Sequence, residues 1–154
     1  NQFPLDDFPM KGKDVKHRRF TLADTTYGGQ GSEEPPGCRS TFHRHGPTAV
    51  IIVTQGEGFV MLWKDGEPRQ RHDFKAGTVY SPDDLMWHGH FNAGKGTMRH
   101  FAIRGESPKY SHDRFRNPLW TMIPMNEEPS EIHREYVEIL AKNGVQAAVS
   151  VVED

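Results

Sequence analysis

The sequence predicts an all-β fold, an antiparallel barrel or sandwich, followed by a single helix. Between residues 39 and 104, short strand-like runs follow one another with turn signals between them and no helical pattern. Asp65-Gly66 separates two of these runs and is a strong hairpin signal. Helical spacing of apolar residues is convincing only over 127–143. We therefore expect one domain over 1–154, with the barrel over about 15–105.

Seven candidate strands form the centre of the predicted barrel, and glycine, proline or aspartate marks the turns between them. Closely spaced short strands of this kind are typical of antiparallel sheets. The candidates are 39–45, 48–55, 58–64, 68–74, 78–81, 85–91 and 97–103.

The residues before this region divide into an arm, a strand and a loop. Residues 1–14 contain two prolines and little periodicity, so we expect an N-terminal arm that lies across the surface. Residues 16–22 favour a first strand. Residues 24–38 contain several glycines and Pro35-Pro36, which predict a loop.

The C-terminal helix is predicted over 127–143. Pro129 suits a first helical turn, and Asn143-Gly144 is typical of a C-cap. The apolar side chains share one face, which is expected to pack in the core or in a dimer. They are Ile132, Tyr136, Ile139 and Leu140. Residues 105–125 show no regular pattern and are expected to be irregular.

Composition narrows the class of function. The net charge is -2 and no basic stripe is present, which argues against nucleic acid as the main partner. No run of about 18 apolar residues exists, so we expect no membrane-spanning segment. The single cysteine, Cys38, cannot form an internal disulfide, and a cytoplasmic location fits this.

The arrangement of the histidines carries the chemistry. His43-Arg44-His45 lies in a predicted strand, where alternate residues share a face, so both imidazoles can point into the barrel. His88-Gly89-His90 repeats this geometry on a second strand. Imidazoles that meet in this way suit Fe(II), Mn, Ni, Cu or Zn, and three protein ligands leave coordination positions open.

These residues resemble the two signature motifs of the cupin superfamily. The first motif is matched by Gly37, His43, His45 and Gly56, with Ala49 where the motif has a glutamate. The second motif is matched by Gly77, Pro82, His88 and Asn92, with Asp84 in place of a glycine. The resemblance covers about 65 residues and implies a single cupin β-barrel with a metal held by His43, His45 and His88.

The alanine at position 49 refines the resemblance. A site without the glutamate is a three-histidine site. The combination of His-Arg-His, this alanine and Trp-His-x-His is similar to the gentisate, salicylate and 1-hydroxy-2-naphthoate 1,2-dioxygenases. That resemblance implies Fe(II) as the cofactor and His90 as a catalytic acid–base group beside the substrate. In that family an arginine pairs with the substrate carboxylate two residues after the alanine, where this chain has Ile51.

Several further residues are candidates for contact with the substrate. His100 follows a strand-like run and could reach the interior, and Gln55 and Tyr80 could line the cavity. Arg44 lies between two predicted ligands and therefore faces away from the metal, and Trp87 is expected to pack on that same side. Arginines could bind an anionic substrate: the candidates are Arg39, Arg99 and Arg104.

Three functions remain open at this point. The first is an Fe(II) dioxygenase that takes O2 and a small aromatic, hydroxy-acid or carbonyl-bearing substrate. The second is a non-redox metal cupin, such as a lyase, isomerase or hydrolase, and the third is a non-catalytic small-molecule-binding cupin, because fold does not decide function. A homodimer or higher homo-oligomer is expected, since cupins commonly pair through barrel edges and the N-terminal arm.

Overall fold

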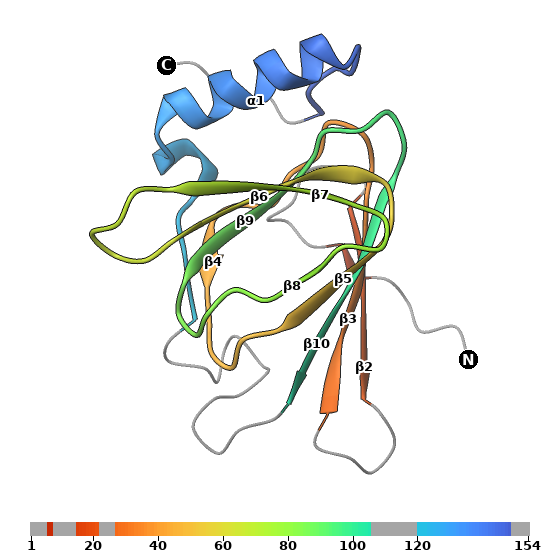
Figure 1. Ribbon diagram of the computed structural model, residues 1–154, viewed down its shortest axis with the longest axis vertical. Coiled ribbons are helices and arrows are strands. Elements are labelled where there is room, and N and C mark those ends of the chain that lie inside the picture. The colour runs from red at the N-terminus through yellow and green to blue at the C-terminus, as the bar shows by residue number, and fades with distance from the viewer. Residues whose placement is uncertain (1–5, 8–14, 22–26, 106–119, 149–154) are drawn as a thin grey trace.

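The computed structural model describes residues 6–7, 15–21, 27–105 and 120–148. In these residues, two antiparallel sheets, one α-helix and a short 3-10 helix form the regular structure (Figure 1). The predicted all-β fold with a C-terminal helix is confirmed. The arm predicted for residues 1–14 lies outside the described residues apart from Asp6–Asp7, whose backbone pairs with the following strand.

The first sheet has six strands among the described residues, in the order β1-β2-β3-β10-β5-β8. Each neighbour in this order pairs in antiparallel fashion. The strands are β1 (Asp6–Asp7), β2 (Lys16–Thr21), β3 (Tyr27–Glu34), β10 (Met98–Gly105), β5 (Val50–Gln55) and β8 (Val79–Tyr80).

The second sheet has five described strands, in the order β11-β4-β9-β6-β7. Strands β6 and β7 form the hairpin predicted at Asp65-Gly66, and Gly66 has the positive φ of 82° that this turn requires. The strands are β11 (Thr121–Met122), β4 (His43–Arg44), β9 (Trp87–Asn92), β6 (Glu57–Trp63) and β7 (Gln70–Lys75).

Strand β3 corrects the prediction that residues 24–38 form a loop. It pairs with β2 on one side and with β10 on the other, so it is an interior strand. Its glycines allow a close approach rather than a turn, since a Cβ at Gly29 would collide with the carbonyl oxygen of Ala102 on β10. The glycines were interpreted as loop breakers, and that interpretation was wrong for β3, where Gly29 allows contact between strands.

Other boundaries differ less from the expectation. The predicted strand 39–45 is regular only over His43–Arg44, with an isolated bridge between Arg39 and Phe91. Within the segment expected to be irregular, Thr121–Met122 pairs with β4. The helix α1 runs from Ser130 to Lys142, with Pro129 as the N-cap rather than in the first turn and Asn143 as the C-cap.

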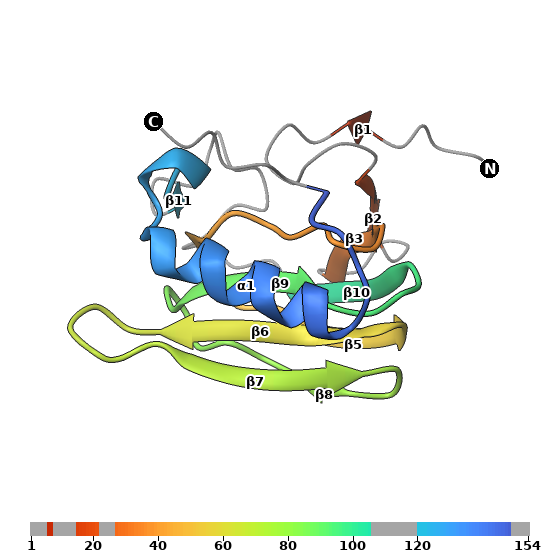
Figure 2. The same cartoon turned by 90° about the horizontal axis from the view of Figure 1, so that it is seen from above.

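Helix α1 packs on the outer face of the second sheet (Figures 1 and 2). The predicted apolar stripe supplies Ile132, Tyr136 and Leu140, all of them buried. They contact side chains that alternate along β6 and β9, including Phe59 and Phe91, whose rings stack at 4.5 Å. The largest apolar cluster of the described residues therefore lies outside the barrel, between sheet and helix.

The interior of the barrel is divided along its length. One part is closed by an apolar cluster of Val53, Val60, Phe74 and Met98. The other part holds the histidines and a cavity.

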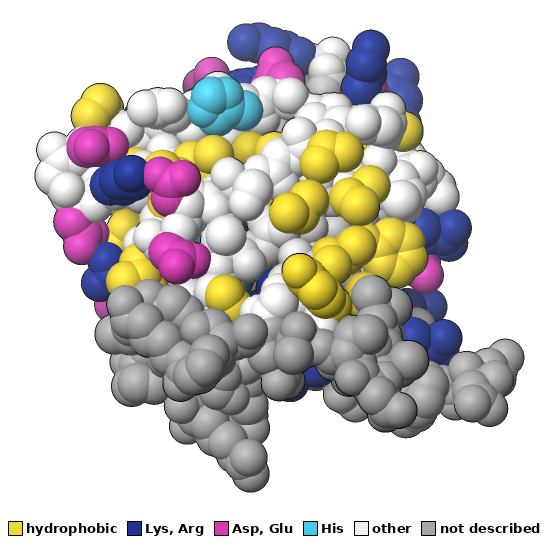
Figure 3. Space-filling model, turned by 60° about the horizontal axis from the view of Figure 1, so that its bottom comes forward, with side chains coloured by type: hydrophobic (Ala, Val, Ile, Leu, Met, Phe, Trp, Pro, Cys, Tyr) yellow, Lys and Arg dark blue, Asp and Glu magenta, His cyan; other side chains and the backbone are white. Residues whose placement is uncertain are grey.

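The outside of the molecule also carries hydrophobic side chains, and Figure 3 shows them gathered on the surface that it draws. Four exposed ones belong to the outer face of the first sheet: Val79, Tyr27, Phe101 and Val50. Among the described helices, none has the length and apolar character needed to cross a bilayer.

Candidate metal centre

Three histidines meet on the inner face of the second sheet. His43 on β4 is paired directly with His88 on β9, and His45 follows β4 by one residue. Their ring centroids are 4.3 Å apart for His43 and His88, 5.0 Å for His45 and His88, and 5.7 Å for His43 and His45. One ligand nitrogen from each lies within 4.8 Å of the others, so the three could hold a metal ion.

The orientation of each ring is fixed by a backbone carbonyl two residues away. Nδ1–H of His43 donates to the Thr41 oxygen at 3.0 Å, and Nδ1–H of His88 donates to the Met86 oxygen at 2.9 Å. His45 donates in the same way to Pro47 at 3.1 Å. A carbonyl can only accept, so these bonds place the proton on Nδ1 and the lone pair on Nε2. Such outer hydrogen bonds are typical of histidines that ligate metals.

The donor set fits a divalent transition metal. Three neutral imidazoles suit Fe(II), Mn, Ni, Cu and Zn alike, so the set does not select among them. In the described residues no carboxylate joins this group, and Ala49 lines the cavity at the position where the cupin motif has its glutamate. The site is therefore a possible three-histidine metal site with one side turned toward a cavity.

Strands of both sheets line this cavity. Along β10, alternate residues His100, Ala102 and Arg104 face it, and Ala49 and Ile51 contribute an apolar wall. The full lining among the described residues is Gln30, His43, His45, Thr48, Ala49, Ile51, Pro82, Asp83, His88, His90, His100, Ala102 and Arg104.

His90 lies beside the three histidines, with its ring 5.7 Å from that of His88. Its Nδ1 is 2.7 Å from the hydroxyl oxygen of Tyr80 on β8, and its ring is 5.1 Å from His100. Burial, with a smaller contribution from the charge of Glu34, raises the pKa of Tyr80, so its hydroxyl keeps its proton at neutral pH. His90 and His100 both line the cavity, whereas Tyr80 is not among its described lining residues and is connected to it through the hydrogen bond to His90.

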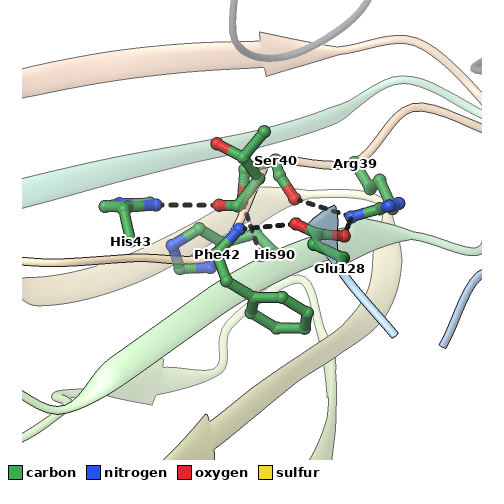
Figure 4. A network of polar contacts seen from close by, with 7 residues as sticks. Arg39, Ser40, Phe42, His43, His90 and Glu128 are labelled. Carbon is green, nitrogen blue, oxygen red and sulfur yellow. Dashed lines mark hydrogen bonds and ion pairs between the residues drawn. The ribbon is translucent and has the colours of Figure 1, made fainter. Parts of the chain in front are cut away.

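Arg39 does not line the cavity, contrary to the expectation that it binds substrate. Its side chain is 1% exposed and forms a buried ion pair of 2.6 Å with Glu128 (Figure 4). Glu128 also accepts a hydrogen bond from the backbone N–H of Phe42, the residue before His43. Burial raises the pKa of Glu128, while the charge of Arg39 opposes the shift. Arg39 and Glu128 therefore hold the chain that carries the ligands.

Gln55 also lies outside the cavity. It is exposed at the end of β5 and accepts a hydrogen bond of 3.1 Å from Arg99. The prediction failed because the β5–β10 register shifts between Arg99 and His100, which sequence alternation along one strand does not reveal.

The outward orientation of Arg44 and Trp87 is as predicted. The Arg44 guanidinium lies 4.5 Å from the centre of the Trp87 ring and pairs with Asp65 at 2.6 Å, and Trp87 Nε1–H donates to that same carboxylate. Gln30 was not among the predicted site residues, because it belongs to the strand that was predicted as a loop. Arg104 was one of the arginine candidates for an anionic substrate, and it lines the cavity.

Comparison with known proteins agrees with this architecture. Residues 32–104 match the Cupin domain family. No curated protein matches the chain by sequence.

Solved structures with the same fold include proteins of several kinds. An oxalate decarboxylase of Lactobacillus farciminis has a TM-score of 0.61 at 16% identity over 88% of this chain, which spans 38% of the length of that protein. A cupin-like protein of Thermotoga maritima has a TM-score of 0.59 at 16% identity, covering 86% of this chain and 91% of that one. The CENP-C cupin domain of Drosophila melanogaster has a TM-score of 0.51 at 13% identity, covering 60% and 69%.

At these identities the solved structures establish the fold and leave the reaction open. The family match over residues 32–104, the two antiparallel sheets and the histidine geometry all agree. The described residues have the cupin fold, with a possible three-histidine metal site.

Proposed function

We propose that this chain is a metal-dependent cupin enzyme, an Fe(II) dioxygenase acting on a small aromatic, hydroxy-acid or carbonyl-bearing substrate. The observation that carries the proposal is the convergence of three imidazoles whose Nδ1 protons are all engaged by carbonyls. A barrel that only packs its interior has no need to orient three neutral nitrogen donors toward one point.

His43, His45 and His88 would hold the ion. When bound, iron supplies a redox-active Lewis acid that can serve both O2 and an oxygen donor of the substrate. The choice of iron rests on the resemblance to three-histidine dioxygenases, and the alanine at position 49, which lines the cavity, supports it.

The residues around the ligands have separate roles in this proposal. His90 takes the proton from a substrate hydroxyl at Nε2, with its Nδ1–H donating to the hydroxyl oxygen of Tyr80. Tyr80 is a positioning residue that fixes the orientation of the His90 ring. Ala49, Ile51 and Ala102 provide an apolar wall that limits water beside the reacting group.

A non-redox metal cupin is the second candidate. The donor set supports it, since three imidazoles suit Zn, Mn and Ni as well as Fe(II), and one protein of the same fold, an oxalate decarboxylase, is named for the removal of a carboxyl group. This candidate needs the same three ligands but predicts turnover with Zn, Mn or Ni and no consumption of O2.

The first experiment measures bound metal. The protein is purified without chelator, and its metal content is determined by elemental analysis beside His88→Ala and a control, His72→Ala, which changes an exposed histidine on β7. We expect about one ion per chain in the wild type and in the control, and loss of the ion in His88→Ala.

The second experiment separates the candidates. O2 uptake is followed with hydroxylated aromatic acids after loading with Fe(II) or with Zn(II). Uptake that requires iron supports the dioxygenase, and turnover with zinc and no uptake supports the second candidate. A wild type that takes up neither iron nor zinc would contradict both and would leave a small-molecule-binding barrel.

A further inference from the structure

One cationic side chain reaches the cavity wall from the middle of the first sheet. Arg104 follows His100 and Ala102 at alternate positions of β10, and all three line the cavity. Opposite Ala102 in the neighbouring strand is Gln30, which also lines it. The cavity therefore has an imidazole cluster, an apolar wall and a polar wall formed by a guanidinium and an amide.

The charge of Arg104 has no anion beside it in the described residues. Its Nε is shielded from solvent and makes no hydrogen bond. Burial, together with the nearby positive charge of Arg19, lowers the pKa of Arg104 to about 10. Asp83 is the one carboxylate of the described lining, and it forms an ion pair of 2.6 Å with Lys64.

Arg104 is half-buried, and a partly desolvated cation without an anionic partner lowers the stability of a protein, so such a group is a candidate for binding a ligand. Guanidinium binds carboxylate strongly because its parallel N–H groups match the two oxygens. A small carboxylate would supply the missing anion, and Ala49 and Ile51 lie on the apolar wall of the same cavity.

We infer that Arg104, with Gln30 beside it, binds a carboxylate group of the substrate, and that the substrate is therefore a small organic acid. This inference rests on the proposed function, because the other end of the acid is directed to the three-histidine site. It selects acids from the wider set of aromatic, hydroxy-acid and carbonyl-bearing substrates proposed above.

The test compares an acid with its neutral isostere. 2-Hydroxybenzoate and 2-hydroxybenzamide are each titrated by calorimetry into the metal-loaded protein, for the wild type and for Arg104→Gln. We expect the wild type to bind the acid at least about tenfold more tightly than the amide, and Arg104→Gln to lose this preference. Arg104→Lys keeps the positive charge but lacks the two parallel N–H groups, so it should keep part of the preference for the acid.

Two controls make the outcome specific. Arg99→Gln changes an exposed arginine on the same strand and should leave the preference unchanged. Metal content and thermal midpoint are measured on every sample, and Arg104→Gln should match or exceed the wild-type midpoint, since it removes a half-buried charge without an anionic partner. Absence of metal from the wild type would contradict the proposed function. A loaded wild type without acid preference, or an unchanged preference in Arg104→Gln, would overturn the role of Arg104 alone.

Discussion

The two faces of strand β9 differ in chemistry although they alternate along six consecutive residues. On the outer face, Trp87, Gly89 and Phe91 are buried beneath helix α1 and against β6. On the inner face, His88 and His90 are equally buried but belong to the histidine cluster and the cavity. One strand therefore serves the largest apolar cluster with one set of side chains and the candidate metal centre with the other.

This difference shows how the site can be kept in a fixed geometry. Buried imidazoles contribute little apolar area, so the strand that carries them must be held by something else. Stacking of Phe91 on Phe59 and the cover of α1 provide this from the opposite side. We expect stability and metal binding to depend on different faces of the same strand.

The largest effect on stability is expected from Phe91→Ala. Loss of a fully buried ring between sheet and helix should lower the free energy of unfolding of the metal-free protein by about 3–5 kcal/mol. Chemical denaturation measures this, with Val137→Ala on the exposed side of α1 as a control that should change it by no more than about 0.5 kcal/mol.

The matched change on the inner face is His88→Ala. It should abolish metal binding while lowering the free energy of unfolding of the metal-free protein by less than Phe91→Ala does, because the imidazole buries less apolar surface. Denaturation and metal titration on the same samples test whether the outer face of β9 determines stability and the inner face determines metal binding. Equal losses of stability in the two variants would contradict this separation.

A smaller effect is expected from Gly89→Ala, in the centre of the outer face. The added methyl group would lie 2.7 Å from a ring carbon of Phe42, so the ring or the strand must move. Overpacking of this kind costs about 1–3 kcal/mol. Because Phe42 precedes His43, metal affinity should also fall, which a titration with Zn(II) would detect; an unchanged affinity would mean that the helix side absorbs the strain.

Tyr136→Phe tests the contact between α1 and two backbone carbonyls, one in the segment between β3 and β4 and one at the end of β9. The Tyr136 hydroxyl lies 2.9 Å from the Cys38 oxygen and 2.7 Å from the Asn92 oxygen. Burial raises the pKa of Tyr136, so the hydroxyl stays protonated and donates. Its removal should cost about 1–2 kcal/mol in denaturation, with metal content unchanged. A loss of bound metal would instead tie the helix contact to the site.

The smallest effect concerns acid stability at the outer rim of β9. Hydrogen bonds from Arg44 and Trp87 lower the pKa of Asp65. A carboxylate with a lowered pKa in the folded state stabilises the protein above its ordinary pKa, and this contribution disappears as pH falls below about 4. Thermal midpoints between pH 5 and pH 3 should therefore fall more steeply in the wild type than in Asp65→Asn. If the thermal midpoints of the wild type and of Asp65→Asn fell in parallel with pH, the stabilising contribution of the Asp65 carboxylate would be contradicted.

The strand pattern and the ligand set could be predicted from the sequence because both depend on neighbouring residues. Alternation along a strand places His43 with His45 and His88 with His90, and it turns Arg44 and Trp87 outward. Strand β3 was missed because glycine marks both turns and close contacts between strands, and only the position of Ala102 shows which applies.

The choice among the arginines could not be made in the same way. Arg39 and Arg104 are similar in sequence context, yet one is paired with Glu128 and the other lines the cavity. Arg39 and Glu128 are far apart in the chain, and no local pattern connects them. The failure for Gln55 has a similar origin, since a register shift between β5 and β10 changes which residues meet.

The sequence by itself determined the all-β class, the closing helix, the hairpin at Asp65-Gly66 and the three histidines of the possible metal site. These follow from periodicity, turn chemistry and motif spacing, which act over a few residues. The tertiary structure decided which carbonyls orient the imidazoles, that α1 covers the second sheet, and that Arg104 rather than Arg39 reaches the cavity. Those outcomes depend on strand register and on contacts between distant segments, where the folded chain selects among locally equivalent side chains.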